Sequence, residues 1–140
     1  GNRTLCGALA RVKTYLDYGI FGPIQIAGAH ALATADEIVG AVRETYRLRR
    51  DALCAGLARA GWDVPVPRAT MFAWARIPEK FGMRSMEFAR WLLEHADAAV
   101  APGAGFGPGG DDFVRFGLVE SVERTQAATE RIGRALASRR

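Results

Sequence analysis

The sequence predicts an α/β (α+β) domain in which helices pack on a small mixed sheet, preceded by one long helix. Apolar residues recur at three- and four-residue spacing through one extended stretch in the first half of the chain. Short apolar, β-prone runs then alternate with amphipathic stretches in the order strand, helix, strand, loop, strand, helix. Apolar residues make up 49% of the 140 residues and charged residues 24%, a composition typical of a globular domain with a real core.

The N-terminal part is predicted to be helical throughout. Residues 5–16 carry apolar side chains at helical spacing, and residues 23–32 do so again, with Pro23 suited to a first helical turn. The stretch DYGIFGP, which contains two glycines, separates the two helices. Nothing in these residues joins them to the strand-containing part that follows.

The long helix is expected over residues 34–61. Thr34 or Asp36 can cap its start by accepting a hydrogen bond from a first-turn amide, and Gly61 suits its end. A helix of this length often runs from one structural unit to another.

The elements after the long helix are short. Strands are expected at residues 71–77, 97–103 and 113–120, and helices at residues 85–96 and 121–140. Ser85 and Ser121 are the expected caps of these two helices, and Glu123 lies in the first turn of the second.

The net charge of +4 does not indicate a nucleic-acid-binding surface. The densest basic cluster, between Arg43 and Asp51, is interrupted by acidic residues, which is typical of a solvated helix face. We therefore expect no nucleic-acid partner.

Membrane and metal functions are also disfavoured. The sequence contains no run of about 18 apolar residues, and its N-terminus lacks a signal-peptide pattern. Cys6 and Cys54 lack the CxxC spacing, and neither His30 nor His95 has a carboxylate or cysteine at metal-ligand spacing. We expect no membrane partner, no metal site, packing or surface roles for both histidines, and a cytoplasmic location.

Five glycines fall between Gly103 and Gly110 and suggest a nucleotide-binding loop. The dinucleotide fingerprint requires a strand before the glycines and a helix after them, whereas here a strand follows. No Lys-Ser/Thr pair completes a phosphate loop either. A flexible surface loop at the rim of a pocket is the better interpretation.

Arg115 is a charge inside an apolar strand, FVRFGLVE. Because side chains alternate along a strand, Arg115 shares one face with Phe113 and Gly117, and Val114 and Phe116 share the other. A guanidinium has a planar fork of donors that matches a carboxylate or phosphate, so a ligand site is one interpretation. A structural ion pair with a nearby acid (Asp111, Asp112 or Glu120) is equally compatible with the spacing.

Two long stretches carry a family resemblance. The block from TMFAWARIPEKFG through SMEFARWLLEHADAAVAPGAGFGPGGDDFVRFGLVES resembles the C-terminal domain of class I/II pyridoxal-phosphate aminotransferases of fold type I. The segment KTYLDYGIFGPIQIAGAHAL resembles the one preceding the interdomain helix of these enzymes. The most similar subgroup is that of alanine aminotransferases and LL-diaminopimelate-aminotransferase-like enzymes. Members usually carry a glycine pair before the MFAWARI strand, where this chain has Arg68-Ala69-Thr70, and we expect this difference to change little chemically.

The resemblance implies a division of the chain and roles for two residues. Residues 1–34 would be the incomplete tail of a large cofactor-binding domain, and residues 35–140 a small C-terminal domain that includes the interdomain helix. Arg115 would pair with the α-carboxylate of the substrate, and the loop AVAPGAGFG would help to close the pocket above the cofactor. Tyr18 would reach across a homodimer to line the neighbouring subunit's active site.

The resemblance also implies that the catalytic groups lie outside this chain. In the family, pyridoxal 5′-phosphate is bound mainly by an upstream part, which supplies the Schiff-base lysine, a ring-binding aspartate and a phosphate-binding arginine. Lys13 and Lys80 do not stand in the context of that lysine. We assign no catalytic residue here and expect the chain alone to be inactive. The full-length protein would transfer an amino group from an amino acid to a 2-oxo acid.

Two non-enzymatic functions stay open at this point. The same aminotransferase half occurs in transcription regulators, fused to a helix-turn-helix region, where it senses a ligand. A non-catalytic binding module is the other alternative. The sequence contains no helix-turn-helix pattern, which favours the enzyme.

Overall fold

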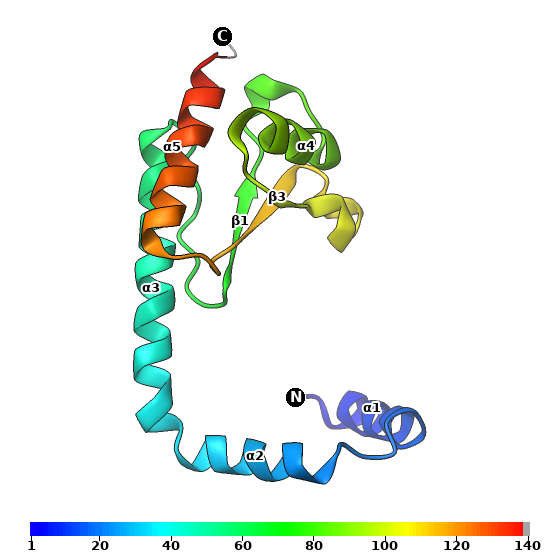
Figure 1. Ribbon diagram of the computed structural model, residues 1–140. Helices are drawn as coiled ribbons and strands as arrows, with labels where there is room; N and C mark the ends of the chain where they lie inside the picture. The colour runs from blue at the N-terminus through cyan, green and yellow to red at the C-terminus, as the bar shows by residue number, and fades with distance from the viewer. Residues whose placement is uncertain (139–140) are drawn as a thin grey trace. The chain divides into compact units, whose positions relative to one another are not determined.

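The computed structural model describes residues 1–138 (Figure 1). The chain has two compact units, Gly1–Ala41 and Val42–Arg140. The boundary falls within α3 (Ala35–Arg59), a helix of 25 residues that agrees with the long helix predicted from the apolar spacing.

The first unit consists of α1 (Arg3–Leu16), α2 (Gly22–Ala33) and the start of α3. The side chain of Asn2 caps α1 by accepting hydrogen bonds from two first-turn amides, at 3.0 and 3.1 Å. Pro23 lies in the first turn of α2, as predicted. Neither α1 nor α2 has a buried residue, so these two helices do not build a core of their own.

The second unit holds the strands and the core. After α3 its elements are β1 (Phe72–Arg76), η1 (Glu79–Phe81), α4 (Ser85–Ala96), β2 (Ala101–Pro102), η2 (Gly103–Phe106), η3 (Pro108–Gly110), β3 (Phe113–Gly117) and α5 (Val122–Ser138). The strands form one small sheet with helices packed on it, which confirms the predicted fold class (Figure 1).

The sheet differs in one respect from the mixed sheet that the sequence suggested. β1 and β2 run in the same direction and are connected through α4. They are not neighbours, because β3 lies between them and pairs antiparallel with both. Every strand pairing among the described residues is therefore antiparallel.

The helices cover one face of the sheet. The core joins inward-facing strand residues to the apolar sides of α3, α4 and α5; its members include Ala73, Ala75, Val114, Phe116, Leu57, Phe88, Leu92 and Ile132. Figure 1 shows α5 beside the later turns of α3. Gly56 permits this close approach, because a Cβ at this position would overlap the side chain of Thr129. Within the described residues of the second unit, α3, α4 and α5 leave the opposite face of the sheet uncovered.

The two predicted serine caps have different outcomes. Ser121 accepts a hydrogen bond from a first-turn amide of α5 at 3.3 Å, which confirms its role. Ser85 is the first residue of α4 rather than its cap, so that prediction was wrong. Its buried hydroxyl donates to Asp111 Oδ1 at 2.7 Å and accepts from the Ala104 amide at 3.1 Å. Ser85 therefore fastens the glycine-rich loop to the start of α4.

Candidate functional site

Arg115 lies on the sheet face opposite the core, which α3, α4 and α5 do not cover in the described part of the second unit. Along β3, Val114 and Phe116 are buried in the core, whereas Phe113 and Arg115 point to the other side and are partly exposed. This alternation confirms the faces predicted from the sequence. Trp74 of β1 is the direct cross-strand neighbour of Arg115.

Two aromatic rings hold the Arg115 guanidinium. Its Cζ lies over the Phe72 ring at 3.9 Å from the centroid and over the Phe106 ring at 4.3 Å. Trp74 packs edge-on against Phe106 at 5.6 Å and stacks on Phe113 at 5.5 Å. A cation over the face of a ring is attracted by the ring quadrupole, so these contacts stabilise one position of the guanidinium.

These rings were not among the site residues predicted from the sequence. The alternation of Phe72 and Trp74 along β1 places both on the face of Arg115, and could have indicated their role. Phe106 lies in the glycine-rich loop, where no periodic signal shows which way a side chain points.

The structural ion pair considered for Arg115 does not form among residues 1–138. Its three candidate partners are engaged elsewhere: Arg84 binds Asp111 at 2.9 Å and Asp112 at 2.7 Å, and Arg124 binds Glu120 at 3.0 Å. Within the described residues, no carboxylate pairs with Arg115 and no oxygen accepts a hydrogen bond from its side chain. Its donors are available to a ligand.

Arg115 lines a groove of about 610 Å³. The groove runs over the outer face of β1 and β3 and is bounded by the segment before β1; its lining is Pro65, Val66, Pro67, Ala69, Thr70, Phe72, Trp74, Arg76, Phe113 and Arg115. Arg76, the other cation of this groove, has an ion pair with Glu79 at 3.6 Å. Arg115 is thus the lining cation that lacks an internal carboxylate partner in the described part of the chain.

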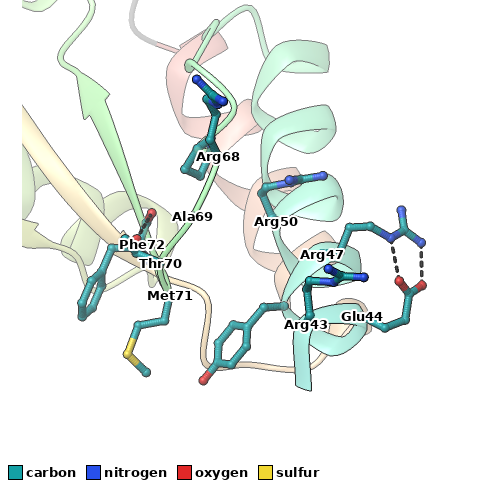
Figure 2. A pocket seen from close by; sticks show the side chains of 11 residues that line it. Arg43, Glu44, Arg47, Arg50, Arg68, Ala69, Thr70, Met71 and Phe72 are labelled. Atoms are coloured by element: carbon teal, nitrogen blue, oxygen red, sulfur yellow. Dashed lines mark hydrogen bonds and ion pairs between the residues drawn. The ribbon is translucent and has the colours of Figure 1, made fainter. Parts of the chain in front are cut away.

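A second groove, of about 870 Å³, lies between α3 and the segment before β1 (Figure 2). Figure 2 shows Arg47 and Glu44 joined on its rim, away from Met71. Arg47 also pairs with Asp51 at 2.9 Å. Arg47 is thus paired with acids of its own helix, in agreement with the predicted solvated helix face.

Thr70 lies between the two grooves and lines both. Its backbone has φ +74°, a left-handed conformation that is unusual for a β-branched residue. Its hydroxyl bonds the backbone of Phe72, accepting from the amide at 3.1 Å and donating to the carbonyl at 3.2 Å. Glycine adopts this conformation without strain, so residue 70 carries a backbone cost that a glycine would not. The expectation that Arg68-Ala69-Thr70 in place of a glycine pair changes little chemically stays a prediction.

The glycine-rich loop is compact and attached at both ends. A Cβ on Gly103 would overlap the Gly110 carbonyl, and a Cβ on Gly110 would overlap that of Gly103, so the two backbones touch. The Ser85 hydroxyl, the Ser85 amide and the Arg84 guanidinium all donate to Asp111. These bonds, that of the hydroxyl above all, lower the pKa of Asp111 below its ordinary value.

The other predicted residues lie as follows. Tyr18 is 91% exposed in the turn between α1 and α2, with φ +49°, and its proposed contact with a neighbouring subunit stays a prediction. His30 is exposed on α2, and His95 stacks on Trp91 at 5.0 Å, which agrees with surface and packing roles. Residues 1–138 contain no group of three potential metal ligands, and none of their helices is long and apolar enough to cross a membrane.

Residues 1–132 match the family described as aminotransferase class I and II. The chain belongs to this family. It is 52% identical over 139 residues to the putative aminotransferase AatC of Rhizobium meliloti, covering 99% of this chain and 34% of that protein. It is 49% identical over 129 residues to the glutamate-pyruvate aminotransferase AlaC of Escherichia coli, covering 91% of this chain and 31% of that protein. LL-diaminopimelate aminotransferases are also among its relatives, so the subgroup named from the sequence is confirmed.

Solved aminotransferases share the fold. The probable N-succinyldiaminopimelate aminotransferase of Thermus thermophilus superposes with a TM-score of 0.81 at 37% identity, over 96% of this chain and 36% of that one. This aminotransferase chain therefore spans about a third of the length of the relatives that it matches.

Class I and II aminotransferases depend on pyridoxal phosphate, and the described residues do not supply a site for its carbonyl chemistry. Lys13 lies on α1, where its ammonium pairs with Asp17. Lys80 lies on η1 over the Phe81 ring, at 5.4 Å from the centroid, and does not line the Arg115 groove.

Proposed function

We propose that this chain is the C-terminal part of a pyridoxal-phosphate aminotransferase that transfers an amino group from an amino acid to a 2-oxo acid. Family membership and the match to a third of longer aminotransferases support the proposal. The observation that carries it is the position of Arg115, a partly buried cation on an open groove without a carboxylate partner in residues 1–138. Its role is to bind the α-carboxylate of both the amino acid and the oxo acid.

The division of the chain follows from the same proposal. Residues 1–34 belong to the end of a large cofactor-binding domain, and residues 35–140 form the small domain with its interdomain helix. The absence of buried residues from α1 and α2 supports this division, since these helices need other surfaces to cover their apolar sides.

Pyridoxal phosphate is bound mainly by parts of the protein outside this chain, which alone is catalytically incomplete. The test is to mix the 140-residue chain with the cofactor, an amino acid and a 2-oxo acid. We expect no oxo acid to form from the amino acid, whereas sustained turnover would contradict this part of the proposal.

Substitution of Arg115 tests the carboxylate role in the full-length enzyme. Arg115→Ala should raise KM about a hundredfold for every amino acid and oxo acid, because a buried carboxylate without its partner costs about 2–5 kcal/mol. The matched control is Arg90→Ala, since Arg90 is an exposed arginine of α4 outside the groove. An unchanged KM in the Arg115 variant would contradict the proposal that Arg115 binds the α-carboxylate.

Tyr18 is proposed to line the active site of the neighbouring subunit in a homodimer. Hybrid dimers test this, because a subunit with Tyr18→Ala and a subunit with Arg115→Ala together rebuild one intact site. At a substrate concentration well below the raised KM, random mixing of the two impaired variants should restore activity to roughly a quarter of the wild-type sites. No recovery of activity on mixing would argue against the contact of Tyr18 with the neighbouring subunit.

A cytoplasmic location stays a prediction from the sequence.

A further inference from the structure

The glycine-rich loop delivers one aromatic side chain to Arg115. Phe106 ends η2, and its ring lies under the Arg115 Cζ at 4.3 Å. Gly107 directly follows with φ +118°, a conformation that a residue with a side chain rarely adopts. The chain can therefore turn away immediately after Phe106 and leave the ring in place.

The backbone of the loop is fixed near both of its ends. The Gly103 and Gly110 backbones are in contact, and the buried Ser85 hydroxyl accepts a hydrogen bond from the Ala104 amide at 3.1 Å. Trp74 supports the ring itself, edge to face, at 5.6 Å. The fixed loop backbone and the contact with Trp74 thus restrict the position of the Phe106 ring, although this side chain is 53% exposed.

The hydrogen-bond donors of the Arg115 guanidinium are not used within residues 1–138. A carboxylate binds arginine through two parallel N–H donors in the plane of the guanidinium, whereas aromatic rings take its faces. Phe72 and Phe106 approach Arg115 as rings, and no described residue accepts a hydrogen bond from its side chain. The same contacts restrict the rotamers of a long side chain before any ligand binds.

We propose that Phe106 is a positioning residue, whose ring, together with that of Phe72, holds the Arg115 guanidinium ready for the substrate carboxylate. The glycine-rich loop serves to place this ring. This inference rests on the proposed function of Arg115. It assigns to the loop a role in carboxylate recognition that does not depend on binding a phosphate.

The test uses the full-length enzyme with Phe106→Leu, which removes the ring, and Phe106→Tyr, which keeps it. Phe106→Leu should raise KM for amino acid and oxo acid on the order of tenfold with kcat nearly unchanged, and Phe106→Tyr by less than about twofold. The dissociation constant of a simple unreactive carboxylate, measured by calorimetry, should rise in parallel. Leu93→Ala on the exposed side of α4 is the control and should change neither value.

A double-mutant cycle separates this inference from the proposed function. In an Arg115→Gln background, Phe106→Leu should change KM by less than about twofold, because its effect acts through Arg115. If Arg115→Gln raises KM but Phe106→Leu does not, the positioning role is wrong and the function of Arg115 stands. Equal effects of Phe106→Leu in both backgrounds would also overturn the positioning role. If Arg115→Gln leaves KM unchanged, the proposed function fails together with the inference.

Discussion

Thr70 keeps a left-handed backbone, φ +74°, directly before the strand that carries Phe72 and Trp74. For a residue with a Cβ this conformation is less favourable than for glycine by about 1–2 kcal/mol. The two hydrogen bonds between the Thr70 hydroxyl and the Phe72 backbone offset part of that cost. They also fix the start of β1, where the ring of Phe72 lies under Arg115.

The conformation of Thr70 predicts an unusual order of stabilities. Thr70→Gly and Thr70→Ala both remove the hydroxyl, but only glycine adopts the left-handed conformation without strain. The glycine variant should therefore be the more stable of the two by about 1 kcal/mol in chemical denaturation. The opposite order would show that residue 70 does not hold a positive φ in solution.

Residue patterns predicted the direction of Arg115 but not its contacts. Alternation along FVRFGLVE places Arg115 away from the core, because strand geometry is local and regular. The pairing of Asp111 and Asp112 with Arg84, 27 and 28 positions away, depends on how α4 meets the loop. Spacing along the chain could not choose between Arg84 and Arg115 as the partner of these acids.

The start of α4 and the beginning of β3 are joined by a small polar cluster. Ser85 and Arg84 donate to Asp111, which lies two residues before β3. The Ser85 amide also donates to the Asp111 carbonyl at 2.9 Å. The cluster fixes the end of the glycine-rich loop relative to α4. Its carboxylate is favoured in the ionised form, since all its partners are donors.

This cluster predicts a dependence of stability on pH. The Ser85 hydroxyl, first among the causes, lowers the pKa of Asp111 in the folded chain, so folding favours the ionised carboxylate. The stabilisation is present above the unfolded pKa of about 4 and is lost as the pH falls through the lower folded value. In urea denaturation, the free energy of unfolding of the wild type should exceed that of Asp111→Asn near pH 6, and this difference should shrink below about pH 4. A difference that does not change with pH would contradict the role of the charge.

The order of the strands shows a second limit of local patterns. β1 and β2 run in the same direction, since each pairs antiparallel with β3. β3 lies between β1 and β2, and its Val114 and Phe116 pack in the core against the helices. This position depends on contacts between residues that are far apart in the sequence. The fold class was therefore accessible from the sequence, whereas the strand order was not.

The molecule as a whole joins a packed domain to helices without a core. Within residues 1–138, the buried apolar cluster belongs to the second unit, and the apolar side chains of α1 and α2 are exposed. Large exposed apolar surfaces mark sites of interaction. This arrangement supports the proposal that the chain, which spans about a third of its relatives, works as part of a longer aminotransferase.

The most direct measurement compares two substrates in the full-length enzyme: its best amino acid and the amine that lacks only the α-carboxylate. The ratio of their kcat/KM values reports recognition of the carboxylate, independently of the side chain. The wild type should strongly prefer the amino acid, and Arg115→Gln should lose about a hundredfold of that preference. A variant that discriminates as well as the wild type would show that another group binds the carboxylate.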